Sequence, residues 1–294
     1  MNLQQLCAGL PPKRADVPFP THLLGVFRRK SITFATGVTD ERTVVYWFQS
    51  AGFTIDLRLP HGDRTRVAER QGWIGDTVWD DAAGLLSWNI ASSYQPRNQW
   101  PEPARLHAIG NAVLEFAPSG AYVEDWRQQA TIGPLLGLRL IDMVDEATGE
   151  RISLDGGLVL AGDHVAFARA RQPGIQARLL DVEDLDAAVS AGLTTSAEVE
   201  SYEVSVALGG ELVTFSTQDQ RIGQAIVGPE FEITPDGDVT LPRIIDGRAW
   251  LLRFAVDCYD PACAFGNQSP LTPEARVWMD RESEHLLVNA ETCR

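Results

Sequence analysis

Hydrophobic and polar residues alternate along most of this chain, a pattern typical of half-buried β-strands. Between Phe53 and Leu59, every second residue is apolar and the residues between them are polar or charged. Turn-forming residues separate such runs, and only short stretches have helical spacing. The pattern therefore predicts a mainly β protein with few, short helices.

Two turn signals predict hairpins. Thr39-Asp40 is expected to join residues 32–34 to residues 44–48. Asp236-Gly237 is expected to join residues 231–234 to residues 239–241.

The same order of elements occurs twice. Leu23-Leu24-Gly25 opens a strand-like run in the first half, and Leu135-Leu136-Gly137 opens the matching run in the second. A later run ends at Pro60 in the first half and at Pro173 in the second. The offsets between these two pairs of landmarks agree to within a single position. A period this long exceeds that of solenoid repeats and predicts two copies of one small domain.

The domain boundaries follow from these landmarks. We predict a first domain over residues 21–130 and a second over 134–256, with a linker near 129–134. A short helix-like stretch follows the proline in each half, at residues 66–71 and 181–190. Many antiparallel strands with few helices favour closed sheets, because closure removes exposed edges. The fold class predicted is therefore mainly β, with two tandem antiparallel β-barrels.

Two extensions flank the predicted domains. Residues 1–20 are rich in proline, and we expect them to run over the surface. Residues 257–294 are predicted to contain a helix over about 272–284. Thr272-Pro273-Glu274 supplies its N-cap, its first-position proline and an acid in its first turn. One arrangement considered for this helix is that it lies across one of the barrels.

Several short motifs resemble a known group of folds. They are Trp47-Phe48-Gln49-Ser50, Ile55-Asp56-Leu57-Arg58-Leu59-Pro60, Gly72-Trp73, Trp88, Leu114-Glu115-Phe116, Tyr122-Val123-Glu124-Asp125-Trp126 and Gly162-Asp163-His164-Val165-Ala166-Phe167-Ala168-Arg169. With them, most of residues 40–256 resembles calycin barrels, the lipocalin and fatty-acid-binding type. The chain is similar in particular to a family of poorly characterised bacterial and fungal proteins with two calycin-like (lipocalin-like) barrels.

The tandem arrangement is also similar, more distantly, to carotenoid hydratases and two-barrel pericyclases. The two-barrel calycin-like family implies a fold and leaves the activity open. The hydratases and pericyclases imply cofactor-free chemistry on apolar substrates. Their catalytic residues do not match this sequence position by position.

Charge and composition exclude several classes of partner. The net charge is −15, which argues against binding to nucleic acid or to an anionic membrane. Only Lys13 and Lys30 are lysines, so Schiff-base chemistry has almost no candidate. Residues 1–13 lack the pattern of a signal peptide, and no apolar stretch is long enough to span a bilayer. We expect a cytoplasmic protein, and its oligomeric state stays open.

No cofactor or metal site is expected from the motifs. The sequence has no Gly-x-Gly-x-x-Gly, no phosphate-binding Gly-Lys-Ser/Thr loop, no His-Glu-x-x-His and no Gly-x-Ser-x-Gly. The five histidines are scattered along the chain. Four cysteines in a chain of 294 residues favour free thiols, with a Cys258–Cys263 disulfide as the alternative.

Tryptophan is distributed unevenly between the halves. Six of the eight tryptophans lie in the first half, and the second half has only Trp250 before the C-terminal helix. Core packing is one explanation, because each ring buries a large area. The other is a ligand cavity in the first barrel. The predicted ligand-binding residues are Trp47, Trp73, Trp79, Trp88 and Trp126.

Three polar residues are candidates for chemistry in that cavity: Arg58, Glu115 and Tyr122. Arg58 shares a strand face with Asp56, and both face solvent if the apolar face of the strand points inward. If they point inward instead, Arg58 is an anchor for a carboxylate or phenolate. When the two prolines are aligned, Asp56 corresponds to Arg169 and Arg58 to Arg171.

For Glu115 and Tyr122, too, the role depends on whether the side chain points into the barrel or to solvent. Glu115 is either an exposed strand residue or a buried acid with a raised pKa, suited to proton transfer. Tyr122, Glu124 and Trp126 share one strand face.

Two functions follow from these alternatives. In the first, the first barrel binds a small hydrophobic or aromatic molecule, as a ligand-binding protein or as a cofactor-independent isomerase, cyclase or hydratase. In the second, side chains fill both barrels and the protein is a non-catalytic interaction module. A Trp-lined cavity with a buried polar group favours the first function, and a filled barrel favours the second.

Overall fold

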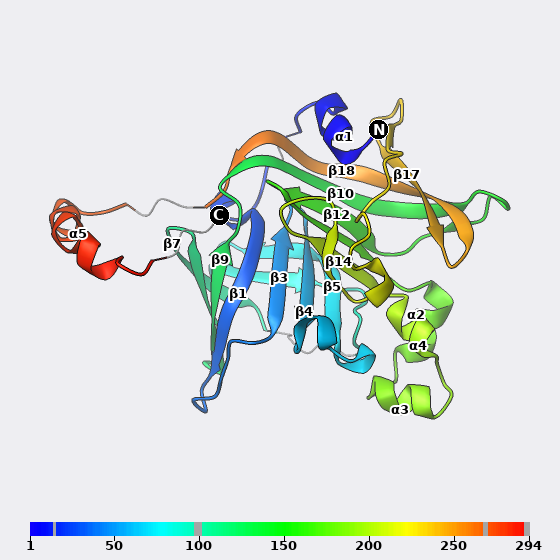
Figure 1. Ribbon diagram of the computed structural model, residues 1–294, viewed down its shortest axis with the longest axis horizontal. Coiled ribbons are helices and arrows are strands. Elements are labelled where there is room, and N and C mark those ends of the chain that lie inside the picture. The colour runs from blue at the N-terminus through cyan, green and yellow to red at the C-terminus, as the bar shows by residue number, and fades with distance from the viewer. Residues whose placement is uncertain (14–15, 97–101, 267–269, 291–294) are drawn as a thin grey trace.

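The computed structural model describes residues 1–13, 16–96, 102–266 and 270–290. The chain forms two antiparallel sheets that lie against each other (Figure 1). No helix among these described residues is long and apolar enough to cross a membrane.

The first sheet is a closed barrel of eight strands. They are β1 (Gly25–Phe34), β3 (Val44–Gln49), β4 (Phe53–Leu59), β5 (Gln71–Asp80), β6 (Leu85–Asn89), β7 (Ala104–Ile109), β8 (Ala112–Phe116) and β9 (Tyr122–Gln128). Each strand pairs with the next, and β9 pairs back onto β1, from Phe27↔Gln128 to Phe34↔Tyr122. A closed barrel in the first half is therefore confirmed.

The first predicted hairpin has a different pairing from the one expected. Thr39 and Asp40 are not a turn but form the short strand β2 (Thr39–Asp40), which pairs with the C-terminal end of β1. Residues 32–33 therefore pair with β2, while β3 pairs with residues 25–28 of β1. The hairpin at Asp236-Gly237 is confirmed, because residues 232–233 pair with residues 239–240.

The second sheet repeats the strand order of the first. Its strands are β10 (Ile132–Asp145), β11 (Arg151–Ile152), β12 (Gly156–Ala161), β13 (His164–Arg169), β14 (Glu203–Ala207), β15 (Val213–Ser216), β16 (Glu232–Ile233), β17 (Val239–Ile245) and β18 (Arg248–Ala264). The order β15-β14-β13-β12-β10-β18-β17-β16 matches β6-β5-β4-β3-β1-β9-β8-β7 strand for strand, with β11 on β10 as β2 is on β1. This matched order is what the sequence repeat predicts.

A second closed barrel is not confirmed, because β15 and β16 do not pair within the described sheet. The equivalent seam of the first barrel, between β6 and β7, is itself held by only two residue pairs, Leu85↔Arg105 and Leu86↔Ala104. In the second half, β15 has four residues and β16 only two. Two strands this short, with the long segment 217–231 between them, leave the seam open.

The N-terminal extension does not simply run over the surface, as the sequence suggested. Residues 3–9 form the helix α1 (Leu3–Gly9), which begins with a capping box between Asn2 and Gln5. Leu3, Leu6 and Leu10 are buried in the apolar core of the second sheet. This helix therefore supplies core side chains to the sheet that fails to close, and it lies above β18 in Figure 1.

The remaining helices are short and lie mostly between strands. They are η1 (Thr21–Leu23), η2 (Gly62–Arg64), η3 (Val67–Glu69), α2 (Pro173–Leu179), α3 (Leu185–Ser190), α4 (Ser196–Glu200), η4 (Asp219–Arg221) and α5 (Pro273–Leu286). The C-terminal helix α5 is confirmed, and Thr272 caps it by accepting a hydrogen bond from the backbone of Ala275. None of its residues is buried, so α5 does not pack across a barrel.

The two sheets pack through strands that are buried on both faces. Every residue of β3, β4, β12 and β14 is buried. One apolar cluster joins Ile55 and Leu57 of the first barrel to Val204 and Val206 of the second sheet. At Gly157, an added Cβ would lie 3.0 Å from the Phe53 ring, so the glycine allows the sheets this close approach.

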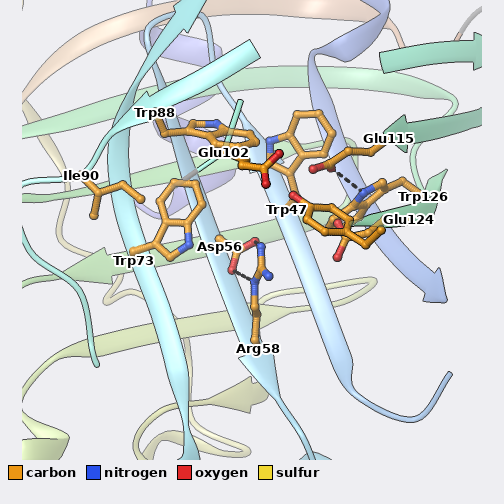
Figure 2. A pocket seen from close by; sticks show the side chains of 11 residues that line it. Trp47, Asp56, Arg58, Trp73, Trp88, Ile90, Glu102, Glu115, Glu124 and Trp126 are labelled. Atoms are coloured by element: carbon orange, nitrogen blue, oxygen red, sulfur yellow. Dashed lines mark hydrogen bonds and ion pairs between the residues drawn. The ribbon is translucent and has the colours of Figure 1, made fainter. Parts of the chain in front are cut away.

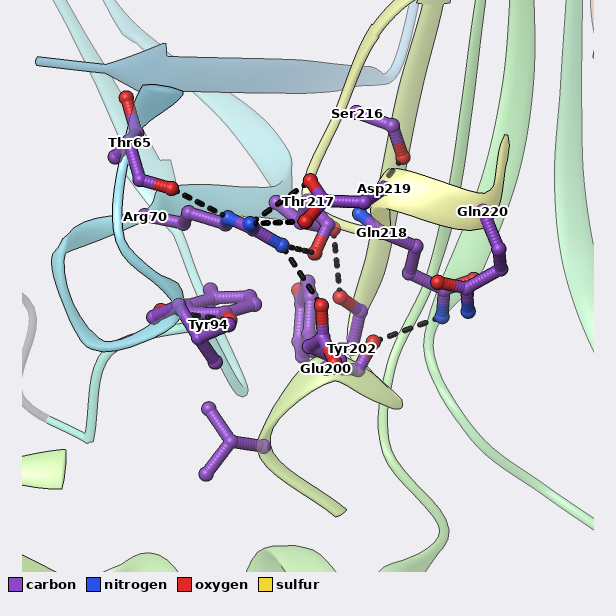
Figure 3. A network of polar contacts seen from close by, with 12 residues as sticks. Thr65, Arg70, Tyr94, Glu200, Tyr202, Ser216, Thr217, Gln218, Asp219 and Gln220 are labelled. Carbon is purple, nitrogen blue, oxygen red and sulfur yellow. Dashed lines mark hydrogen bonds and ion pairs between the residues drawn. The ribbon is translucent and has the colours of Figure 1, made fainter. Parts of the chain in front are cut away.

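A buried arginine links the two halves where the sheets meet (Figure 3). Arg70, which follows η3, donates to Glu200 at 2.8 Å, to the carbonyl of Thr217 at 3.0 Å and to Asp219 at 2.9 Å. It also donates to the carbonyl of Thr65 in its own half at 3.1 Å. One guanidinium thus connects a loop of the first barrel to the loops flanking β14 and β15.

Candidate functional site

The polar face of β4 points into the first barrel. Ile55 and Leu57 are occupied by contacts with the second half, so the alternate residues Asp56 and Arg58 face the barrel interior. Figure 2 shows both side chains among the tryptophans. The apolar face is therefore buried between the sheets, and the solvent-facing alternative for Asp56 and Arg58 is wrong.

Four of the five predicted ligand-binding tryptophans surround one small cavity in the barrel (Figure 2). The ring centroids of Trp47 and Trp88 are 6.3 Å apart, those of Trp47 and Trp126 are 5.7 Å apart, and those of Trp73 and Trp88 are 5.5 Å apart. The fifth, Trp79, does not line this cavity and donates weakly to Asp81 at 3.4 Å.

Two arginines inside the barrel form ion pairs. Arg58 donates to both oxygens of Asp56, at 2.8 and 3.3 Å. Arg29 donates to Glu124 at 2.7 Å and to Asp40, nearer the rim, at 3.1 Å. Burial by itself lowers the pKa of Arg58, but Asp56 and Glu124 outweigh it and hold the pKa above its ordinary value. Arg58 is therefore charged whenever the protein is folded.

Glu115 and Glu124 lie opposite each other on β8 and β9. Burial, and then the charge of Glu124, raise the pKa of Glu115 well above its ordinary value. Trp126 donates its indole N–H to Glu115 at 3.0 Å, and the two carboxyl groups are hydrogen bonded to each other. Glu115 therefore holds its proton more tightly than an ordinary glutamate does, next to the Glu124 side chain that is paired with Arg29. Burial raises the pKa of Asp56 as well, although Arg58 opposes this shift.

Tyr122 completes the polar lining of the cavity. Burial, and then the nearby Glu115 and Glu124, raise the pKa of Tyr122 above its ordinary value. Its hydroxyl is therefore neutral. The structure thus brings all three predicted catalytic candidates, Arg58, Glu115 and Tyr122, to one cavity.

The sequence missed Arg29, although a signal for it was present. Arg28 and Arg29 are consecutive residues of β1, and neighbouring residues in a strand point to opposite faces. One of the two therefore has to point into a closed barrel. Glu102 and Ile90, from the β6–β7 connection, also line the cavity without any periodic signal.

The cavity is narrow. Its volume is about 20 Å³, enough for one or two water molecules. Any larger ligand requires the tryptophans to change position, and Trp88 is the only half-exposed tryptophan among the four. The arrangement can hold a proton at Glu115 and anchor an oxyanion at Arg58, in surroundings with little water.

The arginine matched to Arg58 lies elsewhere. Arg171 follows β13 and sits between the two halves, with its guanidinium over the rings of Tyr94 and Tyr202. It donates to the backbone carbonyls of Tyr94 at 2.7 Å and Val199 at 2.8 Å. Arg171 is therefore not a second interior anchor.

The described residues contain no group of three or more His, Cys, Asp and Glu side chains arranged to hold a metal. Cys7 and Cys258 are free thiols in the described part of the chain, so Cys258 does not form the alternative disulfide with Cys263. Trp100 and Cys293 lie outside the described residues.

Comparison with known proteins identifies no relative: no family model, no curated protein and no solved structure matches this chain. The resemblance to two-barrel calycin-like proteins stays a prediction.

Proposed function

We propose that the first barrel is a cofactor-independent acid–base site for a small hydrophobic or aromatic molecule, acting as an isomerase, cyclase or hydratase. The observation that carries this proposal is the buried pair of Glu115 and Glu124 on neighbouring strands, within a wall of four tryptophans. A strongly perturbed acid in a closed, aromatic-lined space is typical of a site for proton transfer.

The free-energy cost of burying charges inside the first barrel supports a functional role for them. Removing an ion from water costs several kcal/mol, and apolar residues of similar volume often stabilise a fold as well or better. The equivalent interior of the second sheet is packed with apolar side chains such as Phe167, Trp250 and Phe254. The same scaffold thus folds around apolar side chains at these positions, although the second sheet also buries charged residues of its own, including Arg169 and Glu203.

Each polar group has a role in this proposal. Glu115 gives its proton to the substrate, and Glu124 receives the proton removed from a second position. Glu124 then returns this proton to Glu115 through the hydrogen bond between the two side chains, so the pair relocates one proton without a cofactor. Arg58, held by Asp56, pairs with the carboxylate, phenolate or enolate oxygen of the substrate. Tyr122 orients the same oxygen by donating a hydrogen bond.

Binding is tested with a charged and a neutral ligand of similar shape, benzoate and benzyl alcohol, followed by tryptophan fluorescence. Benzoate should quench the emission saturably and more strongly than the alcohol. Arg58→Lys keeps the charge beside Asp56 but loses the planar fork, and should weaken benzoate binding about tenfold. Trp88→Phe should reduce the quenching, whereas Trp79→Phe, outside the cavity, should not. Equal binding of both ligands, or none, contradicts the proposal.

Chemistry is tested separately with phenylacetone, a small aromatic ketone with exchangeable C–H bonds. The wild type should speed the incorporation of solvent deuterium into the ketone. Glu115→Gln keeps the shape of the acid but has no transferable proton, and should remove this acceleration while benzoate still binds. An unchanged rate in Glu115→Gln rules out the role given to Glu115.

The second function, a non-catalytic interaction module, is favoured by one observation, the small cavity of about 20 Å³. If the barrel is permanently filled, neither benzoate nor benzyl alcohol changes the tryptophan emission. The interior ion pairs would then serve only to fix the packing of the barrel.

A further inference from the structure

A second polar pocket lies where the second sheet fails to close. Arg169 at the end of β13, Glu203 at the start of β14, Arg243 on β17 and Arg221 in η4 meet there. Arg243 donates to both oxygens of Glu203, at 2.7 and 2.9 Å. Arg221 donates to Glu203 at 2.9 Å. Elements on both sides of the open seam therefore converge on one carboxylate.

The charges of this cluster do not balance. Three arginines share the single buried carboxylate of Glu203, which leaves an excess of two positive charges. Two further acids line the pocket. Glu200 is engaged by Arg70, and Asp246 is exposed to solvent. Burial alone would raise the pKa of Glu203, but Arg243, Arg169 and Arg221 hold it below its ordinary value. The carboxylate is thus fully ionised, and the excess positive charge remains.

Arg169 has the least internal compensation. It is only 3% exposed. Its single hydrogen bond within the described part of the chain is a long one, 3.4 Å, to the carbonyl of Ala170. The Nε of Arg169 and the Nη1 of Arg243 are buried and have no partner among the described residues. An unsatisfied buried donor costs about 1–3 kcal/mol, and more when it is charged. Burial lowers the pKa of Arg169, and the nearby charge of Glu203 only partly offsets this effect.

Packing explains one of these arginines and not the other. The guanidinium of Arg243 stacks on Phe167, 4.3 Å from the ring centroid. This contact accounts for one face of Arg243. It leaves the unpaired donor of Arg169 unexplained.

The pocket is large enough for a ligand. Its volume is about 290 Å³, against about 20 Å³ in the first barrel. Ser201, Gln218 and Gln220 add polar groups to its wall. We propose that this pocket binds a small polar molecule through an oxyanion group, a phosphate or a carboxylate, held by Arg169 and Arg243.

The two copies of the repeat carry side chains of opposite charge at one matched inward position. Asp56 in the first barrel corresponds to Arg169 in the second sheet, since each lies the same number of positions before the proline that follows it. One copy holds an acid at this inward position and the other holds a base. The second site is therefore independent of the chemistry proposed for the first barrel.

The test uses thermal unfolding and calorimetric titration of the whole protein with inorganic phosphate and with succinate, against sodium chloride at equal ionic strength. Either oxyanion, at about ten times its dissociation constant, should raise the melting temperature by about 3 °C, with no such shift in chloride. A shift with phosphate alone identifies a phosphate ligand, and a shift with succinate alone identifies a carboxylate.

Arg169→Met should weaken oxyanion binding about tenfold or more, because it removes a charge-assisted contact. Without ligand it should unfold at the same temperature as the wild type or higher, since it removes an uncompensated charge. Arg151→Gln, at an exposed arginine paired with Asp142, should change neither property. If Arg169→Met does not fold, Arg169→Lys replaces it and should still weaken binding. No saturable shift in the wild type, or equal binding by the Arg169 variant, overturns the proposal.

Discussion

At the scale of single residues, the first barrel is distinguished by two buried carboxyl groups that face each other. Glu115 is 5% exposed and faces the carboxylate of Glu124 across two paired strands. Two like charges this close disfavour each other, so one of the pair keeps its proton. The pKa of Glu115 is raised in the folded state relative to the unfolded chain.

Because of this raised pKa, the stability of the protein should decrease as pH rises. The folded state binds more protons than the unfolded state between the ordinary pKa of Glu115 and its raised value. Stability is therefore complete below the ordinary pKa and falls as pH rises, by about 1.4 kcal/mol per pH unit where Glu115 alone titrates. Glu115→Gln should flatten this slope, measured as urea unfolding at several pH values. The exposed control Glu41→Gln should keep it, and a slope shared by all three proteins would contradict the assignment.

A residue at the junction of the halves gives a second prediction. Arg70 is 3% exposed and is hydrogen bonded in both halves. Arg70→Met leaves Glu200 without its partner and should destabilise the protein by about 3–5 kcal/mol. Arg66→Met, at a largely exposed arginine nearby, should cost less than about 1 kcal/mol. Both costs are measured by urea unfolding, and equal costs would show that the junction is not held by Arg70.

At the scale of elements, α1 is the segment whose role differs most from expectation. Its leucines complete the apolar core of the second sheet. The signals were present in the sequence. Asn2 and Gln5 have the spacing of a capping box, and Leu3, Leu6 and Leu10 recur three and four residues apart. Proline-rich residues downstream obscured this helix of seven residues, which is about two turns long.

Removing one side chain from this helix tests its role. Leu6 is fully buried. Leu6→Ala should lower the free energy of unfolding by about 2–5 kcal/mol. Gln4→Ala, on the exposed side of the same helix, should change it by less than about 0.5 kcal/mol. The measurement is urea unfolding followed by circular dichroism. A small effect of Leu6→Ala would show that the second core is complete without α1.

At the scale of the whole molecule, the sequence predicted the repeated strand order but not whether each sheet closes into a barrel. The matched landmarks at Pro60 and Pro173 predicted the shared strand order. Closure depends on a few backbone bonds at one seam, and nothing in the alternation of side chains records whether strands as short as β15 and β16 meet. The inward direction of Asp56 was equally hidden, because β4 is buried on both faces and its apolar side meets the other half.

The candidate site divides in the same way. Period-two spacing placed Glu115, Tyr122 and Trp126 on inward faces once the barrel closes. It could not separate Trp79 from the other tryptophans, because the far end of β5 extends beyond the cavity. This spacing could not identify residues of the β6–β7 connection, because side chains in a loop do not alternate regularly between two faces.

The position of α1 also bears on how the chain is made. Leu6 leaves the ribosome long before Phe231, yet both belong to the same core. At ordinary rates of synthesis the interval between them lasts roughly 10–45 s. The strands of the first barrel are all complete by Gln128 and have time to close within it. Throughout that time the leucines of α1 have no finished core to enter, so a nascent chain of this protein carries an exposed apolar segment that a chaperone can bind.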